Sequence, residues 1–305
     1  MKVRGIGFLA IGALALGIPL SVAHPGPARA ATAPLIIVMM ENHGYSQVIG
    51  NSKMPYFNAL WNEGKNKTGP VTDYLQMYAV SHPSLPNYLA IASGYTQHKP
   101  GTDTITVGQI PAKSVWDQLT AAGVSWRVFQ EGMPSTCFNG ITYNSTATDG
   151  QYALKHNPAT PFGPVYASAE CQHVVPLTAL STSSLPQVSF VTPNLCDDDH
   201  GFPSGDPFTN CVTGTPGLLT RGDAWLKSHL TAWTKAGADV LVTWDEGAGT
   251  VHGGGQIAAL LTGPGVPAGQ NSTLFTHYSV LAGIEKKYGL TLLSNAATAS
   301  PVPLP

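Results

Sequence analysis

The sequence has 305 residues, 43% of them hydrophobic, which is enough for one large domain with a full core. Lys and Arg number 15 against 17 Asp and Glu, and the basic residues form no run that would suit a nucleic acid. Beyond the N-terminus, no apolar run is long enough to cross a membrane. We therefore expect neither a nucleic-acid partner nor a membrane span in the main part of the chain.

Residues 1–30 have the pattern of an export signal. Lys2 and Arg4 precede an apolar run over 6–23, and Ala28-Arg29-Ala30 supplies the small residues that a signal peptidase recognises. A retained membrane anchor is the alternative, but the run is short and prolines follow it. We expect cleavage after Ala30, secretion, and a single mature domain over 31–305 with 12 basic and 17 acidic residues, a formal charge of −5.

Four cysteines lie in the exported part of the chain. An even number of cysteines in an oxidising compartment predicts two disulfides, and three pairings are possible. We favour Cys137–Cys171 with Cys196–Cys211 because each of these bonds closes a short loop.

The elements expected along the chain define an α/β fold. Short β-branched runs, typical of buried strands, cover 35–40, 125–129, 188–192, 240–243 and 257–261. Helical patterns lie between them: Leu85 to Ser93, a stripe of Leu226, Leu230 and Trp233 with Asp223 as cap, and a last helix that ends before Gly289. This alternation predicts a three-layer α/β/α sandwich around a largely parallel sheet.

Two stretches, 131–175 and 194–222, interrupt the alternation. They are rich in Gly, Pro, Asn, Asp and Ser and hold all four cysteines. Long stapled loops on an α/β scaffold commonly shape an active site.

Ser84 lies at the predicted N-cap of the helix 85–93. The ordinary role of a serine at this position is to cap the helix. In a functional role, the free N–H groups and the dipole of the helix would hold a phosphate and favour a serine alkoxide. Activation of the same oxygen by a metal ion would make Ser84 a nucleophile.

Acidic residues follow two of the predicted strands. Glu41 and Asn42 come directly after 35–40, and Asp245 and Glu246 follow 240–243. Ligands of open α/β sheets bind beyond the carboxyl ends of the strands, and oxygen donors suit a divalent cation. Either pair alone could also be a solvated strand-end turn.

Histidines and further acids lie in the two long loops. His156 follows Lys155 in the first loop, and Asp197-Asp198-Asp199-His200 follows the strand 188–192. A histidine can protonate a leaving alkoxide. The run of aspartates could instead be a solvated loop or a separate calcium site.

The order of these motifs resembles that of the phosphoesterase family, which holds bacterial phospholipases C and secreted acid phosphatases. Along the chain they are Glu-Asn, His-Pro-Ser-x-Pro-Asn-Tyr, Lys-His-x-Pro, Thr-Pro-Asn with Asp-x-His beyond it, and Thr-Trp-Asp-Glu. Within the family, the chain is similar in particular to secreted acid phosphatases of the mycobacterial type. The resemblance implies an alkaline-phosphatase-like fold, with phosphatidylinositol 3-phosphate as a candidate substrate.

The resemblance also assigns roles to the candidate residues. Ser84 matches the nucleophile, and it shares the expected metal shell with four residues: Glu41, Asn42, Asp245 and Glu246. Residues that match the lining of the phosphate pocket are His156, Asp198 and His200, with His82 as a further candidate for catalysis.

These roles predict a phosphoric ester hydrolase that forms a phosphoserine. We favour phosphate monoesters, because the short chain lacks the extra domains of the larger phospholipases C. A phospholipase C-type phosphodiesterase is one alternative, and a non-catalytic secreted binding protein on the same scaffold is another. The expected cofactor is a divalent metal ion, either Ca, Mg or Mn on oxygen ligands, or Zn or Fe if histidines join them. The expected partner is a phosphate ester, with a phospholipid headgroup as one candidate, and nothing in the sequence indicates the oligomeric state.

Overall fold

The computed structural model describes residues 1–2, 32–145, 150–202, 211–215 and 217–305. The chain divides into two units, Met1–Ala31 and Thr32–Pro305, and every element below belongs to the second unit. The predicted signal peptide and its cleavage site fall almost entirely on residues 3–31, outside the described residues, and stay a prediction. Within the described residues, no helix has the length and apolar character that a membrane span requires.

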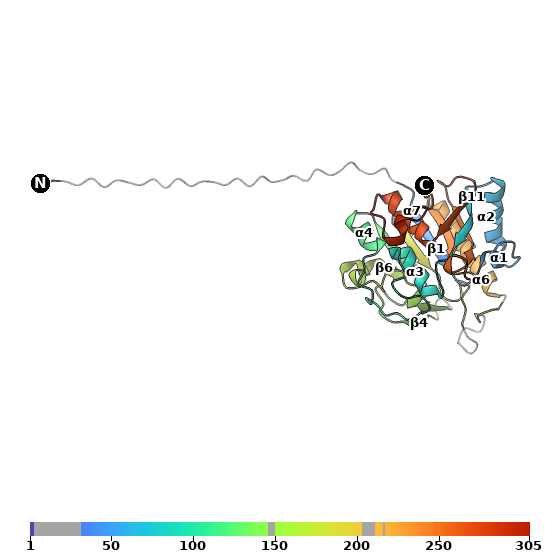
Figure 1. The fold of residues 1–305 in the computed structure, drawn as a ribbon, viewed down its shortest axis with the longest axis horizontal. Helices are drawn as coiled ribbons and strands as arrows, with labels where there is room; N and C mark the ends of the chain where they lie inside the picture. Colours follow the sequence, from blue (N-terminus) through green and yellow to red (C-terminus); the bar gives the residue numbers. More distant parts are fainter. Residues whose placement is uncertain (3–31, 146–149, 203–210, 216) are drawn as a thin grey trace. The chain divides into compact units, whose positions relative to one another are not determined.

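A mixed sheet forms the centre of the second unit (Figure 1). Its strands lie in the order β11-β2-β10-β8-β1-β7-β3-β6, and β9 pairs with β2. Their bounds are β1 (Leu35–Met40), β2 (Val71–Tyr78), β3 (Trp126–Gln130), β6 (Val174–Pro176), β7 (Val188–Thr192), β8 (Asp239–Trp244), β9 (Gln256–Ile257), β10 (Ala259–Thr262) and β11 (Gly269–Thr276).

The predicted parallel core of the sheet is confirmed. β1 pairs in parallel with both β7 and β8, and β3 pairs in parallel with β7 and β6. β10 is antiparallel to both β8 and β2. Every residue of β1, β7 and β8 is buried, which explains why these strands are continuous apolar runs rather than alternating ones.

Helices flank the sheet on both sides, as a three-layer sandwich requires (Figure 1). α2 and α6 pack against each other and against β2 and β8, whereas α3, α4 and α7 form a second group that packs on β3 and β11. The helices are α1 (Tyr45–Val48), α2 (Pro55–Asn66), α3 (Ser84–Ser93), α4 (Val115–Ala121), α5 (Gly163–Tyr166), α6 (Gly217–Lys235) and α7 (His277–Tyr288). The predicted fold class is therefore confirmed.

The predicted start of one helix is wrong. α6 begins at Gly217, so Asp223 lies inside the helix rather than at its cap. Its carboxylate instead accepts the backbone N–H groups of Tyr56 (2.9 Å) and Phe57 (2.8 Å), two residues in the first turn of α2. Asp223 thus fastens α2 to α6 by satisfying the open N–H groups of its neighbour. The predicted apolar stripe of α6 is buried as expected.

α3 lies close to its predicted position. Its N-cap is Pro83, which makes Ser84 the first helical residue rather than the cap. Gly94 ends the helix in the left-handed conformation, at φ 72°, as the sequence predicts. The whole of α3 is buried, so Ser84 starts a helix that points into the molecule.

The long loops contain more regular structure than the sequence indicates. The first includes a hairpin of β4 (Thr142–Ser145) and β5 (Gly150–Ala153), followed by a 3₁₀ turn over Leu154–His156. Both predicted disulfides are confirmed, Cys137–Cys171 and Cys196–Cys211. The second bond closes the loop that follows β7.

Two glycines of α6 give a matched test of the packing between this helix and the loop after β7. A Cβ on Gly222 would collide with Oδ1 of the buried Asp199, whereas a Cβ on Gly217 would meet open space. We expect Gly222→Ala to destabilise the fold by about 1–3 kcal/mol through overpacking. Gly217→Ala should be neutral or slightly stabilising, and thermal unfolding of both variants measures the contrast. Equal melting temperatures would contradict this packing.

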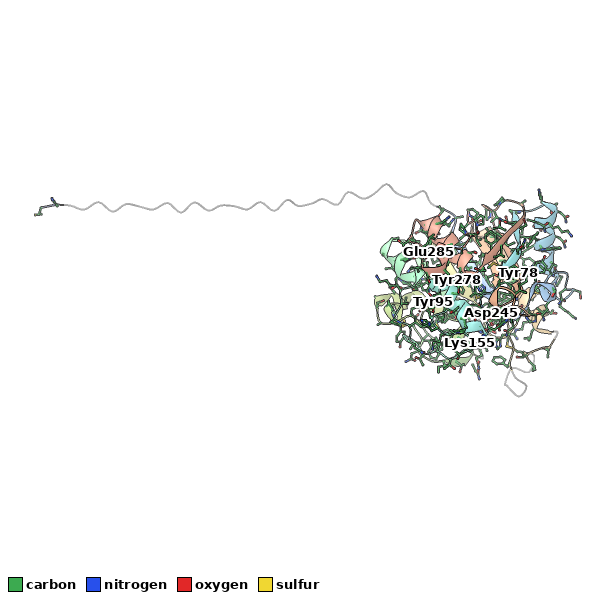
Figure 2. All side chains as sticks on the ribbon, viewed as in Figure 1. Tyr78, Tyr95, Lys155, Asp245, Tyr278 and Glu285 are labelled. Atoms are coloured by element: carbon green, nitrogen blue, oxygen red, sulfur yellow. A yellow bond between two sulfur atoms is a disulfide. The ribbon has the colours of Figure 1, made fainter. Side chains whose placement is uncertain are left out.

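Glu285 on α7 supplies a test of the energetics of burial. It lies far from Lys155 and Asp245 in Figure 2, and burial raises its pKa to about 7 from 4.5. Because the folded-state pKa lies above the unfolded one, Glu285 stabilises the fold fully only below about pH 4.5, and this contribution is lost as pH rises through 7. Glu285→Gln should therefore melt near wild type at pH 4 and above it at pH 8. A difference in melting temperature that is constant with pH would contradict the shift.

Candidate active site

Three neighbouring parallel strands bring acidic residues to one edge of the sheet. β8, β1 and β7 adjoin in this order, and Asp245, Glu41 and Asp198 follow their carboxyl ends. The backbone N–H of Glu41 donates to the carbonyl of Asp198 (2.7 Å), and that of Asp245 donates to the carbonyl of Met40 (2.9 Å). The three strand ends are therefore held together by backbone bonds as well as by the sheet.

Ser84 lies against the first of these carboxylates. Its side-chain hydroxyl donates to Oε2 of Glu41 (2.9 Å), and the hydroxyl of Tyr88 donates to Oε1 (2.6 Å). Residues four apart share one face of a helix, so α3 presents both hydroxyls to the same carboxylate. Asp245 also interacts with Ser84 and Glu41. Ser84 is 1% exposed, which places its oxygen inside the molecule.

Asn42 enters this cluster through its backbone. It adopts the left-handed conformation, at φ 58°, and its N–H donates to Oδ1 of Asp245 (2.8 Å). The turn after β1 thereby holds the Asp245 carboxylate close to Glu41. This backbone contact links the two strand-end pairs that the sequence analysis singled out.

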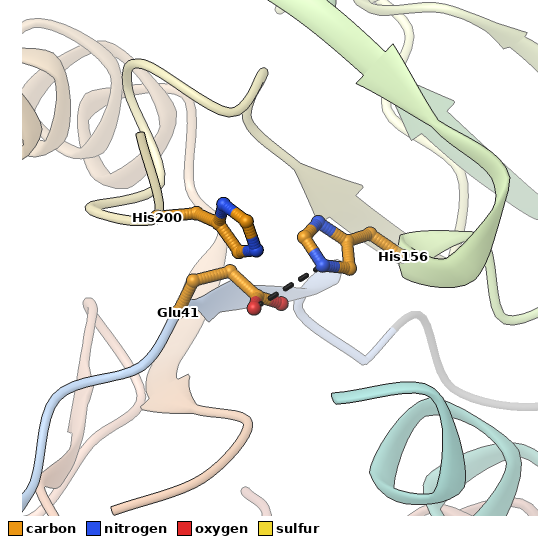
Figure 3. Close-up of side chains that lie close together, drawn as sticks. All are labelled: Glu41, His156 and His200. Atoms are coloured by element: carbon orange, nitrogen blue, oxygen red, sulfur yellow. Dashed lines mark ion pairs between the residues drawn. The ribbon is translucent and has the colours of Figure 1, made fainter. Parts of the chain in front are cut away.

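Two histidines from the long loops face Glu41 (Figure 3). His156 Nε2 lies 3.2 Å from Glu41 Oε2, and its Nδ1 lies 3.3 Å from Asp198 Oδ2. The His156 ring stacks on Tyr88, with ring centroids 5.2 Å apart. Glu41, His156 and His200 each offer a ligand atom within 4.8 Å of the others, which makes them a possible metal site.

Lys155 adds a positive charge beside the histidines. Its Nζ donates to Asp103 Oδ2 (2.8 Å) and to His200 Nε2 (3.0 Å). His200 Nδ1 in turn donates to the carbonyl of Gly201 (2.6 Å). These partners assign the Nδ1–H tautomer to His200, with Nε2 as the lone-pair atom. A metal ion on this Nε2 would take the place of its hydrogen bond with Lys155. Asp103 also accepts the N–H of Leu85 in the first turn of α3, so the lysine is tied to the helix start.

Burial sets the protonation of the acids. It raises the pKa of Glu41 to about 7, against the opposing effect of Lys155. Burial also raises the pKa of Asp198 and Asp245 well above the usual range, and the charge of Glu41 adds to both shifts. Like charges at such distances are costly unless a cation lies between them.

Burial lowers the pKa of both histidines, to about 3 for His200, with further lowering by the charge of Lys155. For Lys155 itself, burial opposes the charged form, but Glu41 and Asp103 outweigh burial and raise its pKa. Near neutral pH the site therefore contains neutral imidazoles and a charged lysine. Neutral imidazoles are the form that binds metal ions.

The donors of this cluster fit a divalent cation. Among the described residues, both ring nitrogens of His156 and the Oδ2 atoms of Asp198 and Asp245 are buried without a hydrogen bond. Buried polar atoms that converge without hydrogen-bond geometry are what a bound cation would satisfy. Carboxylates combined with imidazoles suit zinc, iron or manganese better than calcium. This donor set joins His156 and His200, expected to line a phosphate pocket, to the expected metal ligand Glu41.

His82 and Glu246 form a separate pair at the edge of the site. His82 Nδ1 contacts Glu246 Oε2, and its Nε2 donates to the carbonyl of Gly249 (2.7 Å). Although burial lowers the pKa of His82, these partners outweigh it and raise that pKa. The His82 side chain is 38% exposed, in contrast to the closed cluster around Glu41. Glu246 thus contacts His82, whereas its neighbour Asp245 belongs to the buried cluster.

Sequence reasoning assigned no role to several residues of the site. Tyr88 was part of a quoted motif, and its spacing of four from Ser84 could have placed it on the same helix face. Lys155 was noted beside His156, in the Lys-His-x-Pro motif, without a role of its own. Asp103 had no such signal, since it lies in an irregular loop. Asp199 was noted in the run of aspartates, but its contact with the Trp244 indole (3.2 Å) was not expected.

Solved structures with the same architecture define the class of protein. A protein of the alkaline phosphatase superfamily from Vibrio parahaemolyticus superposes with a TM-score of 0.57 at 12% identity, over 90% of this chain and 70% of that one. The fold is therefore alkaline-phosphatase-like, with the cluster of acids, histidines and serine at the carboxyl edge of its sheet.

The chain belongs to the Phosphoesterase family, whose model matches residues 69–291. It is 32% identical to phosphatidylinositol-3-phosphatase from Mycobacterium tuberculosis, over 97% of this chain and 91% of that protein. It is also 32% identical to an acid phosphatase from Aspergillus fumigatus, over 71% of this chain and 48% of that longer protein. The protein is a phosphoric ester hydrolase, as the sequence analysis expected.

The metal fit can be tested without any assay of activity. A divalent cation that binds only the folded state should raise the free energy of unfolding, by about 2.7 kcal/mol when its concentration is a hundred times its Kd. The melting temperature should rise accordingly. After a chelator has been used and removed, Mn²⁺ or Zn²⁺ should stabilise the wild-type protein in this way. The same cation should not stabilise Glu41→Gln. Glu285→Gln, the same change at a buried glutamate far from the site, should show the same rise in melting temperature as the wild type when the cation is added. An increment that survives in Glu41→Gln would contradict the metal fit.

Proposed function

We propose that this protein hydrolyses phosphate monoesters through a metal-activated Ser84 and a phosphoserine intermediate. The observation that carries the proposal is the position of the Ser84 hydroxyl. It begins a buried helix and donates 2.9 Å to Glu41, one of three residues able to hold a metal ion. A nucleophile, a helix N-terminus and a cation site therefore meet at one oxygen.

The residues that would hold the metal are Glu41, His156 and His200, and the sequence analysis adds Asn42, Asp245 and Glu246 as candidates. A bound divalent cation would neutralise the non-bridging phosphate oxygens and lower the pKa of the serine hydroxyl.

The chain's own groups account for the rest of the reaction. Ser84 Oγ attacks phosphorus while its proton passes to Glu41, which already accepts the hydrogen bond of this hydroxyl. A bond from Oγ to phosphorus forms, the ester bond breaks, and the alcohol departs with a proton. Water then attacks the phosphoserine, which releases phosphate and restores the hydroxyl.

Charge and proton supply divide between two groups. Lys155, which hydrogen-bonds His200, can stabilise the negative charge that develops on the phosphoryl group. Burial lowers the pKa of His156 and His200, so these rings suit metal binding better than proton donation. His82, two residues before Ser84 and raised in pKa by Glu246 and Gly249 against the effect of burial, is the better proton donor for the leaving alcohol.

The names of the relatives favour monoesters. Both the Mycobacterium tuberculosis and Aspergillus fumigatus relatives are named as phosphatases. Phosphatidylinositol 3-phosphate enters as a candidate lipid substrate from the name of the first, which aligns along nearly the whole chain.

Replacement of Ser84 tests the proposed chemistry. Ser84→Ala should lower kcat for p-nitrophenyl phosphate by at least about 10³-fold, because the alanine cannot attack phosphorus. Ser93→Ala changes a buried serine at the other end of the same helix. The Ser93 hydroxyl contacts the carbonyls of Leu89 and Tyr95 and the Gln97 amide, none of which belongs to the site, so this variant should keep most of the activity. Acid quench of the wild-type protein during turnover should trap phosphate on Ser84.

Two results would count against this function. Turnover that survives in Ser84→Ala would overturn the serine nucleophile. Faster hydrolysis of bis(p-nitrophenyl) phosphate than of the monoester would make the protein a phosphodiesterase.

A further inference from the structure

A cavity of about 280 Å³ adjoins the candidate active site on the side of the long loops. Its polar end is formed by Asp103, Lys155 and His200. Its remaining wall is mainly apolar, and the largest side chains in it are Ile105, Ile141, Leu195 and Phe202. Thr142 and Gln151 also line it, so charged, polar and apolar side chains share this cavity.

The apolar wall has its own packing. Ala153, Leu195 and Phe202 belong to a small hydrophobic cluster, separate from the main core, that surrounds the Cys196–Cys211 disulfide. A backbone bond from Leu154 to the carbonyl of Ile141 (2.8 Å) ties the β4–β5 hairpin to the same region. Because the disulfide and the hairpin both stabilise this wall, the cavity can stay open.

The polar end connects the cavity to the reacting groups. Lys155 Nζ contacts both Asp103 and His200, and His200 belongs to the group able to hold a metal. A phosphoryl group at Ser84 and this metal site would thus have Lys155 on the side where the apolar wall begins. A group that extends from the phosphate past Lys155 and His200 would therefore reach this cavity.

The rim of the cavity contains an exposed apolar side chain. Ile141, directly before β4, is 59% exposed. One exposed isoleucine is ordinary on a protein surface, but here it borders a cavity whose inner wall is also apolar. A ligand that covered both would remove the apolar area of rim and wall from water together.

We propose that this cavity binds an apolar alkyl or aryl group of the substrate, attached to the phosphate as its alcohol portion. The inference rests on the proposed function, since it takes Ser84 as the point of attack. It narrows the substrate class to esters of apolar alcohols, in preference to phosphorylated sugars and other polyols, whose hydroxyls would lose water against the apolar wall. The cavity therefore disfavours phosphatidylinositol 3-phosphate, in which the phosphate is esterified to a polyol, as a substrate.

Binding of alkylphosphonates tests the proposal independently of turnover. Methyl- to n-hexylphosphonate share one head group, so calorimetric Kd values report the chain alone. Each methylene that enters an apolar site should tighten binding about fourfold until the cavity is full. A heat capacity of binding that becomes more negative with chain length should accompany the trend.

Ile141→Ser tests the location. We expect it to weaken n-hexylphosphonate about fivefold and to leave methylphosphonate unchanged, because only the longer chain reaches the rim. Leu274→Ser on β11 removes a similarly exposed side chain (41%) outside the cavity and should change neither Kd. Equal effects of Ile141→Ser on both phosphonates would overturn the assignment, as would Kd values independent of chain length in the wild type.

Turnover of n-hexyl phosphate against glucose 6-phosphate then separates the two proposals. A higher kcat/KM for the hexyl ester supports both, and a higher value for the sugar phosphate overturns the cavity assignment alone. If binding follows chain length but neither ester is hydrolysed, the cavity assignment stands and the proposed function is overturned.

Discussion

Four carboxylates are buried together at one edge of the sheet, and the arrangement of the site follows from the cost of keeping them there. Glu41, Asp198, Asp199 and Asp245 are each at most 1% exposed. Three neighbouring parallel strands deliver them, so the topology that forms the core also concentrates negative charge. The hydroxyl groups of α3 and the ammonium group of Lys155 offset part of this cost. Within the described part of the chain, the remaining carboxylate oxygens and ring nitrogens have no hydrogen bond and could bind a cation. A divalent cation bound among these carboxylates would therefore stabilise the fold.

Histidine chemistry differs inside and at the edge of this cluster. His156 and His200 lie inside, where burial and Lys155 lower their pKa values and favour neutral rings. His82 lies at the edge, where Glu246 helps to raise its pKa. Two kinds of imidazole thus arise from one principle, since depth and the sign of the nearest charge decide protonation. The neutral rings therefore lie inside the cluster, and the histidine whose pKa is raised lies at its edge.

The sequence predicted those elements whose local residue pattern matches their environment in the fold. The continuous apolar runs of β1, β7 and β8 are typical of strands buried on both faces. The acids beyond them were singled out because ligands of open sheets bind at the carboxyl ends of the strands. β2 was missed because buried Asp73 interrupts its apolar pattern. Asp223 was misplaced because its partner is another helix, which no local pattern records. Asp103 and Lys155 meet only through the fold, so their pairing at the start of α3 could not be predicted.

The Cys196–Cys211 bond has a consequence for where this protein can mature. It encloses the residues that lead from Asp197 to His200, so the ligand loop and the apolar wall beside it share one covalent fastening. In a reducing compartment that fastening would be open, and His200 would depend on hydrogen bonds alone for its position. The covalent part of this fastening therefore forms only under oxidising conditions.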